Sequence, residues 1–90
     1  MTNQGMRMEI GVEISLYPLA DEFIPPIAAF IERLNTHKGV KVVTNSMSTQ
    51  VFGEYRQVFD LLALECRRTF EQTGKAIFVM KVLGPLPVPA

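Results

Sequence analysis

The chain has 90 residues, which is enough for one domain and too few for two. Hydrophobic residues make up 48% of the sequence and charged residues 20%, a composition that is typical of globular proteins and excludes a disordered chain. Nine basic and nine acidic side chains cancel, so the chain lacks the excess positive charge with which proteins bind nucleic acids or anionic membranes.

The single cysteine, Cys66, excludes an intrachain disulfide and a zinc site built from cysteines, and it fits a reducing compartment. Residues 1–7 predict a flexible polar start without the apolar core of a signal peptide. No apolar run in the sequence approaches the length that spans a membrane. We therefore expect a cytoplasmic protein with no membrane insertion and no nucleic-acid partner.

The first predicted element is a strand over residues 8–16, where apolar and polar positions alternate. All the even-numbered positions carry large apolar side chains, while the odd ones carry glutamate, glycine or serine. A period of two is typical of a strand with one buried face. Pro18 ends this strand because proline has no N–H to donate to a sheet ladder.

A helix follows, from an irregular start at the pair Pro25-Pro26 to about Lys38, with Gly39 as its terminator. Asp21 predicts an N-cap, because its carboxylate can accept hydrogen bonds from the first free N–H groups. Four apolar residues recur at spacings of three and four and predict one buried stripe: Ile27, Phe30, Ile31 and Leu34.

Two short strands are expected over residues 40–46 and 47–52, with a short polar break between them. A second helix then opens at Gly53 and closes at Gly74, a residue type that commonly ends helices. Its inner face is expected to carry Val58, Leu61, Leu62, Cys66, Thr69 and Phe70. Charged residues, Glu65 among them, are placed on the remaining surface of this helix.

The last predicted strand, over residues 75–83, is apolar at nearly every position. Successive side chains of a strand point to opposite faces, so both faces of this strand are apolar. Residues 84–90 carry proline at every second position and predict an extended, polyproline-like arm outside the sheet.

This order of elements indicates a single α+β domain over residues 8–83 with the ferredoxin-like βαββαβ arrangement. Right-handed crossovers place both helices on one face of a four-stranded antiparallel sheet, with the first and third strands in the middle. The helices cover only one face, yet the last strand is apolar on both, so a second subunit is the simplest cover for the open face. We therefore expect a homodimer or a homotetramer.

Catalytic chemistry has little support in this sequence, and we expect no enzymatic activity, no metal and no cofactor. Cys66 falls on an apolar stripe, where cysteines behave as small hydrophobes, and His37, the only histidine, lies at the end of the first helix. The acidic residues show no pairing typical of a hydrolase or a metal site. An acylphosphatase-like hydrolase on this fold would need an anion-binding loop with an arginine after the first strand, and residues 18–21 offer none.

The third strand begins in a polar segment that includes Asn45, Ser48 and Thr49. Antiparallel pairing would set this segment beside the end of the first strand, where Ser15 and Tyr17 lie. Hydroxyl groups and an aromatic ring at one end of a sheet would form a small pocket with donors, acceptors and a flat wall. The alternative interpretation is an ordinary polar loop.

Glu13 and Phe52 are further candidates on chemistry alone. Glu13 lies on the predicted open face of the sheet, where it forms either a salt bridge with Lys81 or an acceptor for a ligand amine; we favour the salt bridge. Phe52, like Tyr17, offers a ring against which an aromatic or cationic ligand would stack.

Four stretches stand out by their order and spacing along the chain: Ser15-Leu-Tyr-Pro18, Asp21-Glu-Phe23, Ser48-Thr49 with Gly53 four residues later, and Val58-Phe-Asp60. Together they resemble the thiamine/hydroxymethylpyrimidine-binding YkoF-like family, and the likeness runs from the first strand to the last. Ser15, Tyr17, Ser48 and Thr49 fall on these stretches, whereas Asn45 and Glu13 do not.

The resemblance implies a ferredoxin-like module that associates sheet to sheet and binds thiamine or its pyrimidine portion without converting it, in vitamin salvage or transport. Some members carry two such modules in tandem, so two copies of this chain would supply what a tandem protein holds in one. The leading hypothesis is therefore a non-catalytic binding protein for thiamine or its hydroxymethylpyrimidine moiety. The alternatives are an oligomeric structural or regulatory domain without a ligand and, last, the acylphosphatase-like hydrolase.

Overall fold

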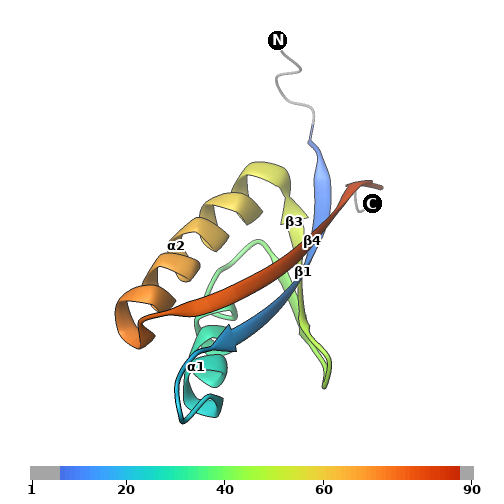
Figure 1. The fold of residues 1–90 in the computed structure, drawn as a ribbon. Coiled ribbons are helices and arrows are strands. Elements are labelled where there is room, and N and C mark those ends of the chain that lie inside the picture. Colours follow the sequence, from blue (N-terminus) through green and yellow to red (C-terminus); the bar gives the residue numbers. More distant parts are fainter. Residues whose placement is uncertain (1–6, 88–90) are drawn as a thin grey trace.

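The computed structural model describes residues 7–87 and has the element order β1 (Glu9–Pro18), α1 (Ile24–Leu34), β2 (Lys41–Thr44), β3 (Thr49–Glu54), α2 (Tyr55–Thr73) and β4 (Ala76–Leu86). The strands form an antiparallel sheet in the order β2-β3-β1-β4, and α1 and α2 pack on the same face of it (Figure 1). The prediction of an α+β, ferredoxin-like βαββαβ arrangement with β1 and β3 in the middle is confirmed.

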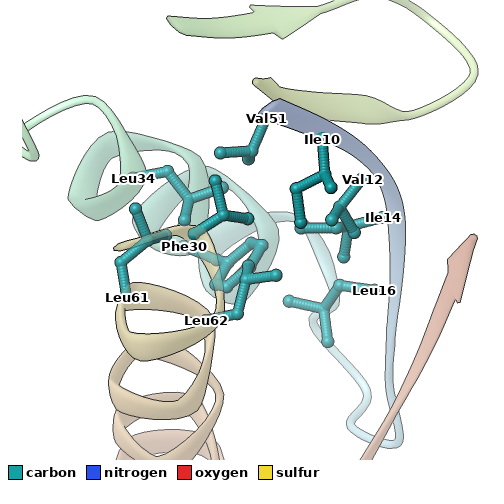
Figure 2. Packing of buried hydrophobic residues seen from close by; sticks show 10 residues of the cluster. Ile10, Val12, Ile14, Leu16, Phe30, Leu34, Val51, Leu61 and Leu62 are labelled. Atoms are coloured by element: carbon teal, nitrogen blue, oxygen red, sulfur yellow. The ribbon is translucent and has the colours of Figure 1, made fainter. Parts of the chain in front are cut away.

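The core forms where β1 meets the two helices. The even-numbered residues of β1 predicted to be buried lie within it, and Figure 2 shows them facing side chains of α1 and α2. The buried cluster consists of Ile10, Val12, Ile14, Leu16, Phe30, Leu34, Val51, Val58, Leu61 and Leu62. The odd-numbered residues of β1 therefore face away from the helices, on what we call the open face of the sheet.

The strands are paired over unequal lengths. β1 pairs with β4 as far as Pro18↔Ala76, but it pairs with β3 only as far as Ile14↔Thr49. The last residues of β1 therefore have a sheet neighbour on one side only. This difference in pairing leaves room beside the end of β1, in the place where the candidate site lies.

The helices begin close to the predicted positions, with different caps, but α1 ends at Leu34, four residues before the predicted Lys38, with Asn35 as its C-cap. Asp21 makes no N-cap, because α1 begins with Phe23 at the cap position, without a side-chain hydrogen bond. α2 begins at Tyr55, two residues after the predicted Gly53, since Glu54 is its N-cap and accepts a hydrogen bond from the Gln57 N–H at 3.0 Å. Gly74, at φ +92°, ends α2 as predicted.

The strand boundaries differ more, and the largest correction concerns the predicted C-terminal arm. β4 runs on to Leu86, which pairs with Glu9 beyond an irregularity in the ladder, so 84–86 belong to the sheet. β4 is an edge strand, and prolines are tolerated at an edge because one side of the strand needs no donors. The remainder of the arm, 88–90, and residues 1–6 of the predicted flexible start lie outside the described residues.

Between the two helices the structure holds a charged cluster that the sequence analysis missed. Glu65, which was placed on the outer surface of α2, is fully buried. Its Oε1 accepts a hydrogen bond from Arg33 Nε at 2.7 Å, and its Oε2 lies 2.7 Å from His37 Nε2 and 3.1 Å from a guanidinium nitrogen of Arg68. Conversely, Phe70 was assigned to the inner face of α2 and is 46% exposed.

Burial alone would raise the pKa of the Glu65 carboxyl. The hydrogen bonds from His37 and Arg33 and the positive charge of Arg68 outweigh the burial, so the pKa of Glu65 lies below its ordinary value. Arg33 also donates to Thr69 Oγ1 at 2.7 Å, which ties the end of α1 to α2 through a second bond. The buried charge is thus fully paired, as a buried carboxylate needs to be.

Candidate ligand-binding site

A pocket of about 200 Å³ lies beside the end of β1, between the sheet and α1. Its walls come from residues 14–17 of β1, from the sheet-facing side of α1 and from residues 44–49, which join β2 to β3. The pocket exists because β3 begins at Thr49 and therefore stops short of the last residues of β1. The polar turn between β2 and β3 closes the side that a longer β3 would have filled.

The pocket brings together most of the residues that the sequence analysis singled out. Ser15, Tyr17, Asn45, Ser48 and Thr49 all line it. The sequence analysis missed the apolar part of the lining, which α1 supplies. The residues concerned are Ile27, Phe30 and Ile31, and their helical spacing was read only as core packing.

Two threonine hydroxyls form one wall of the pocket. Thr44 and Thr49 are the final pair of the β2–β3 ladder, and their Oγ1 atoms lie 3.2 Å apart. Thr49 is 5% exposed, because it sits next to Ile14 in the sheet and points to the helix side. A hydroxyl both donates and accepts, so this pair can offer either function to a small ligand.

Asn45 shapes the turn and uses half of its amide to do so. Its Oδ1 accepts hydrogen bonds from the N–H groups of Met47 at 2.8 Å and Ser48 at 3.1 Å, while its own N–H donates to the Ser48 carbonyl at 3.0 Å. This pattern is an Asx turn, in which the side chain imitates a backbone acceptor. The Nδ2 group has no acceptor within residues 7–87 and remains available as a donor.

Ser15 and Tyr17 lie at the rim of the pocket. They are odd-numbered residues of β1, so their side chains point to the open face while Ile14 and Leu16 point to the helices. Ser15 is half-buried, and Tyr17 is 55% exposed. The position of Tyr17 leaves its ring accessible from solvent at the end of the sheet.

Glu13 and Phe52 do not line this pocket, which corrects the expectation of one shared site. Both border a separate recess of about 280 Å³ on the open face. Phe52 lies across the sheet there because residue 11 is glycine: a Cβ at Gly11 would come within 2.8 Å of the Phe52 ring. Both residues lie on the open face and farther from the end of β1 than Ser15 and Tyr17, which separates them from the pocket.

Both carboxylate oxygens of Glu13 already have partners. Its Oε2 accepts a hydrogen bond from Ser48 Oγ at 2.9 Å, and its Oε1 lies 3.9 Å from Lys81 Nζ. The ion pair with Lys81 is the one favoured from the sequence, and it spans directly paired residues of β1 and β4. Glu13 therefore links the open face to the turn that borders the pocket.

The described residues give no sign of an activated nucleophile. Burial, together with the negative charge of Glu65, raises the pKa of the Cys66 thiol, which is opposite to the shift that makes a reactive thiolate. His37 is engaged with Glu65, and no hydrogen bond joins it to Cys66 in the described part of the chain. Within residues 7–87 no three His, Cys, Asp or Glu side chains gather as a metal site would require.

Neither described helix is long and apolar enough to cross a membrane.

The fold recurs in several solved structures. A Streptococcus pneumoniae protein superposes with a TM-score of 0.80 at 19% identity, over 86% of this chain and 87% of that chain. A Methanocaldococcus jannascii protein gives a TM-score of 0.76 at 17% identity, over 91% of this chain and 86% of that one.

A third similar structure is a Thermotoga maritima protein provisionally assigned to thiamine biosynthesis or salvage. Its TM-score is 0.75 at 18% identity, over 82% of this chain and 81% of that chain. At such identities these likenesses establish the fold alone. A search of curated proteins finds no match. The sequence pattern of the YKOF-related family, however, matches residues 9–83, most of the chain. The chain therefore belongs to the YKOF-related family.

Proposed function

We propose that this protein binds thiamine or its hydroxymethylpyrimidine portion, without converting it, in the pocket between α1 and the end of β1. The observation that carries the proposal is the pocket itself: it has an apolar floor and a hydroxyl wall, and it lies where two of the four family-like stretches meet, those that contain Ser15 and Thr49. The provisional assignment of the Thermotoga maritima protein to thiamine metabolism supports the same ligand class.

The size of the pocket favours the pyrimidine ring as the part that enters. Pockets for drug-sized ligands measure roughly 300–1,000 Å³, whereas this one holds about 200 Å³. A single substituted ring would pack against Phe30 and Ile27, with the hydroxyls of the Thr44–Thr49 pair beside it. The cationic thiazolium of thiamine would then extend to the rim, where a face of Tyr17 would attract it by roughly 0.5–2 kcal/mol.

The test is calorimetric titration of the wild-type protein with thiamine and with hydroxymethylpyrimidine, repeated with Thr49→Val. Valine keeps the shape of threonine and removes one hydroxyl of the pocket wall. We expect both ligands to bind the wild type, and Thr49→Val to weaken the binding about fivefold, which corresponds to a lost hydrogen bond of about 1 kcal/mol.

Thr73→Val, at the far end of α2, is the matched control and should leave the affinity unchanged. Absence of binding of either ligand to the wild type would contradict the proposal and favour a structural or regulatory domain without a ligand. Equal affinities of Thr49→Val and the wild type would remove the threonine pair from the site. The balanced charge and single cysteine of the chain fit a cytoplasmic place of action for such a protein.

We also propose that a second copy of the chain covers the open face. Large apolar side chains are at least half exposed there, and those on β1 and β4 are Tyr17, Ile77, Val79 and Leu83. Sedimentation should show a dimer or tetramer that Val79→Lys dissociates and that Leu64→Lys, on the outer side of α2, leaves intact. A wild-type monomer at micromolar concentration would contradict this second proposal.

A further inference from the structure

The end of β1 presents backbone groups to the pocket, and the hydrogen bonds at both ends of the strand show which ones. In an antiparallel ladder each residue directs its N–H and C=O to the same neighbour, and successive residues alternate. Leu19 N–H donates to the Lys75 carbonyl at 3.2 Å, in register with the β1–β4 ladder, so odd-numbered residues here face β4. Tyr55 N–H donates to the Met8 carbonyl at 2.8 Å, so even-numbered residues face β3.

The even-numbered residues of β1 pair with β3 only as far as the pocket. Ile10, Val12 and Ile14 stand opposite residues of β3, and the next residue in the series is Leu16. The register would place Met47 opposite Leu16, but Met47 lies in the turn, and its N–H donates to the side chain of Asn45. The N–H and C=O of Leu16 therefore point to the side of the missing strand, which is the side of the pocket.

Beside the Nδ2 group of Asn45, this strand edge is a second polar feature of the pocket that is open to a ligand. The hydroxyls of Thr44 and Thr49 already bond to each other, and Ser48 Oγ donates to Glu13. The Leu16 side chain is buried in the core, so its backbone is fixed in place. No strand pairing in the described part of the chain reaches the β3 side of Leu16, so its fixed N–H and C=O need a partner from a ligand or from water.

We propose that the N–H and C=O of Leu16 select the ligand, by binding a flat ring that carries a hydrogen-bond donor next to an acceptor. The ring would take the place of the missing residue of β3: a ring nitrogen accepts from the Leu16 N–H, and an adjacent amino group donates to the Leu16 carbonyl. This inference rests on the proposed function, since an aminopyrimidine edge has this order of groups. The pocket thus distinguishes ligands by the order of donor and acceptor and not by charge.

Amide hydrogen exchange, measured by NMR on the full chain, tests the contact directly. We expect the Leu16 amide to exchange quickly in the free protein and at least tenfold more slowly with saturating hydroxymethylpyrimidine. The amide of Val12, within the ladder opposite Val51 and outside the pocket lining, is the internal control and should not change. If hydroxymethylpyrimidine binds while the exchange of Leu16 stays the same, this inference is overturned and the proposed function stands.

A pair of ligands tests the selectivity. The analogue with a 4-oxo group in place of the 4-amino group presents a carbonyl acceptor where the site needs a donor, so it should bind at least tenfold more weakly than hydroxymethylpyrimidine. Equal affinities of the two compounds would overturn the inference alone. Failure of both compounds and of thiamine to bind would overturn the inference together with the proposed function.

A backbone variant completes the test. Cys66 provides a ligation junction, so the chain can be assembled with the α-hydroxy acid analogue of leucine at position 16, which replaces the Leu16 N–H by an ester oxygen. We expect this ester to weaken ligand binding about tenfold with little change in stability. The same change at Val12, which pairs with Val51 in β3 and does not line the pocket, removes a ladder hydrogen bond and should lower stability while leaving the affinity unchanged. The reverse pattern would overturn the inference.

Discussion

The molecule holds two groups of polar residues against the same helix, α1, and they are built in opposite ways. Near the end of α1 the carboxylate of Glu65 is enclosed by Arg33, His37 and Arg68, and all of its interactions are made within the chain. At the other side of α1 the pocket holds hydroxyls and a strand edge around an open volume of about 200 Å³. The Glu65 carboxylate has its partners within the chain and stabilises the fold, whereas the polar groups of the pocket are not all paired within the described residues and are available to a ligand.

The largest expected effect on stability comes from removing a partner of the buried Glu65 carboxylate. Arg33→Met removes the guanidinium that binds Glu65 Oε1 and leaves a buried carboxylate with fewer compensating charges. Because His37 and Arg68 remain, we expect a loss of about 3 kcal/mol in the free energy of unfolding, at the lower end for a broken buried pair. Urea denaturation monitored by circular dichroism measures the loss.

The control for this prediction is Arg67→Met. Arg67 also forms an ion pair in α2, with Glu71 at 3.2 Å, but both side chains are exposed. An exposed pair one helical turn apart contributes about 0.3–0.5 kcal/mol, so the control should hardly change the stability. Similar losses in the two variants would mean that burial does not distinguish the two ion pairs.

A smaller loss of stability is expected when the pH is lowered. The pKa of Glu65 is lower in the folded than in the unfolded chain, so its ionisation stabilises the fold above its ordinary, unfolded pKa, and this stability is lost as the pH falls through its lower, folded pKa. Glu65→Gln should be less stable than the wild type at pH 7 and should lose less stability on acidification.

Urea midpoints between pH 7 and pH 3 measure this difference. Glu71→Gln, which alters an exposed carboxylate on the same helix, should follow the wild-type profile. If the Gln variant and the wild type lost stability in parallel, the pH dependence would contradict a lowered pKa of the paired Glu65 carboxyl.

The smallest expected effect on stability lies in the pocket. Thr49→Val should change the free energy of unfolding by less than about 1 kcal/mol, because valine fits the same strand position and Thr44 is exposed enough for water to bind its hydroxyl. Hydroxymethylpyrimidine at about 100 times its dissociation constant should stabilise the wild type by about 2.7 kcal/mol.

At that same ligand concentration Thr49→Val should gain about 1 kcal/mol less than the wild type. Arg33→Met should retain the full gain in spite of its lower starting stability. Thermal unfolding with and without ligand measures both gains. If the ligand stabilised Arg33→Met less than the wild type, the residues around Glu65 and the pocket would not be independent.

Much of the fold could be predicted from the sequence because its signals are local. The period of two in β1 and the glycine after α2 mark their elements without reference to the rest of the chain. Glu65 could not be predicted in this way. A glutamate in a helix with many charged residues is read as exposed, and its burial depends on Arg33, which lies 32 positions earlier.

The candidate site was predicted in part for a related reason. The gathering of Ser15 with Thr49 follows from antiparallel pairing, which the order of elements predicts. The separation of Phe52 from the pocket depends on the register, since a shift by one residue exchanges the two faces of a strand. The register was not available from the sequence, and neither was the early end of the β1–β3 pairing that exposes Leu16.

The capping of α1 has a consequence for how its ends behave. Its final turn is tied down by Arg33, and the side chains of Asn35 and Thr36 bind the last carbonyls. Its first turn has no side-chain cap and begins with two prolines, whose rigid rings leave few N–H groups to satisfy. Fraying of α1 will therefore start at Ile24, and the floor of the cavity is firmest at the end nearest the charged residues.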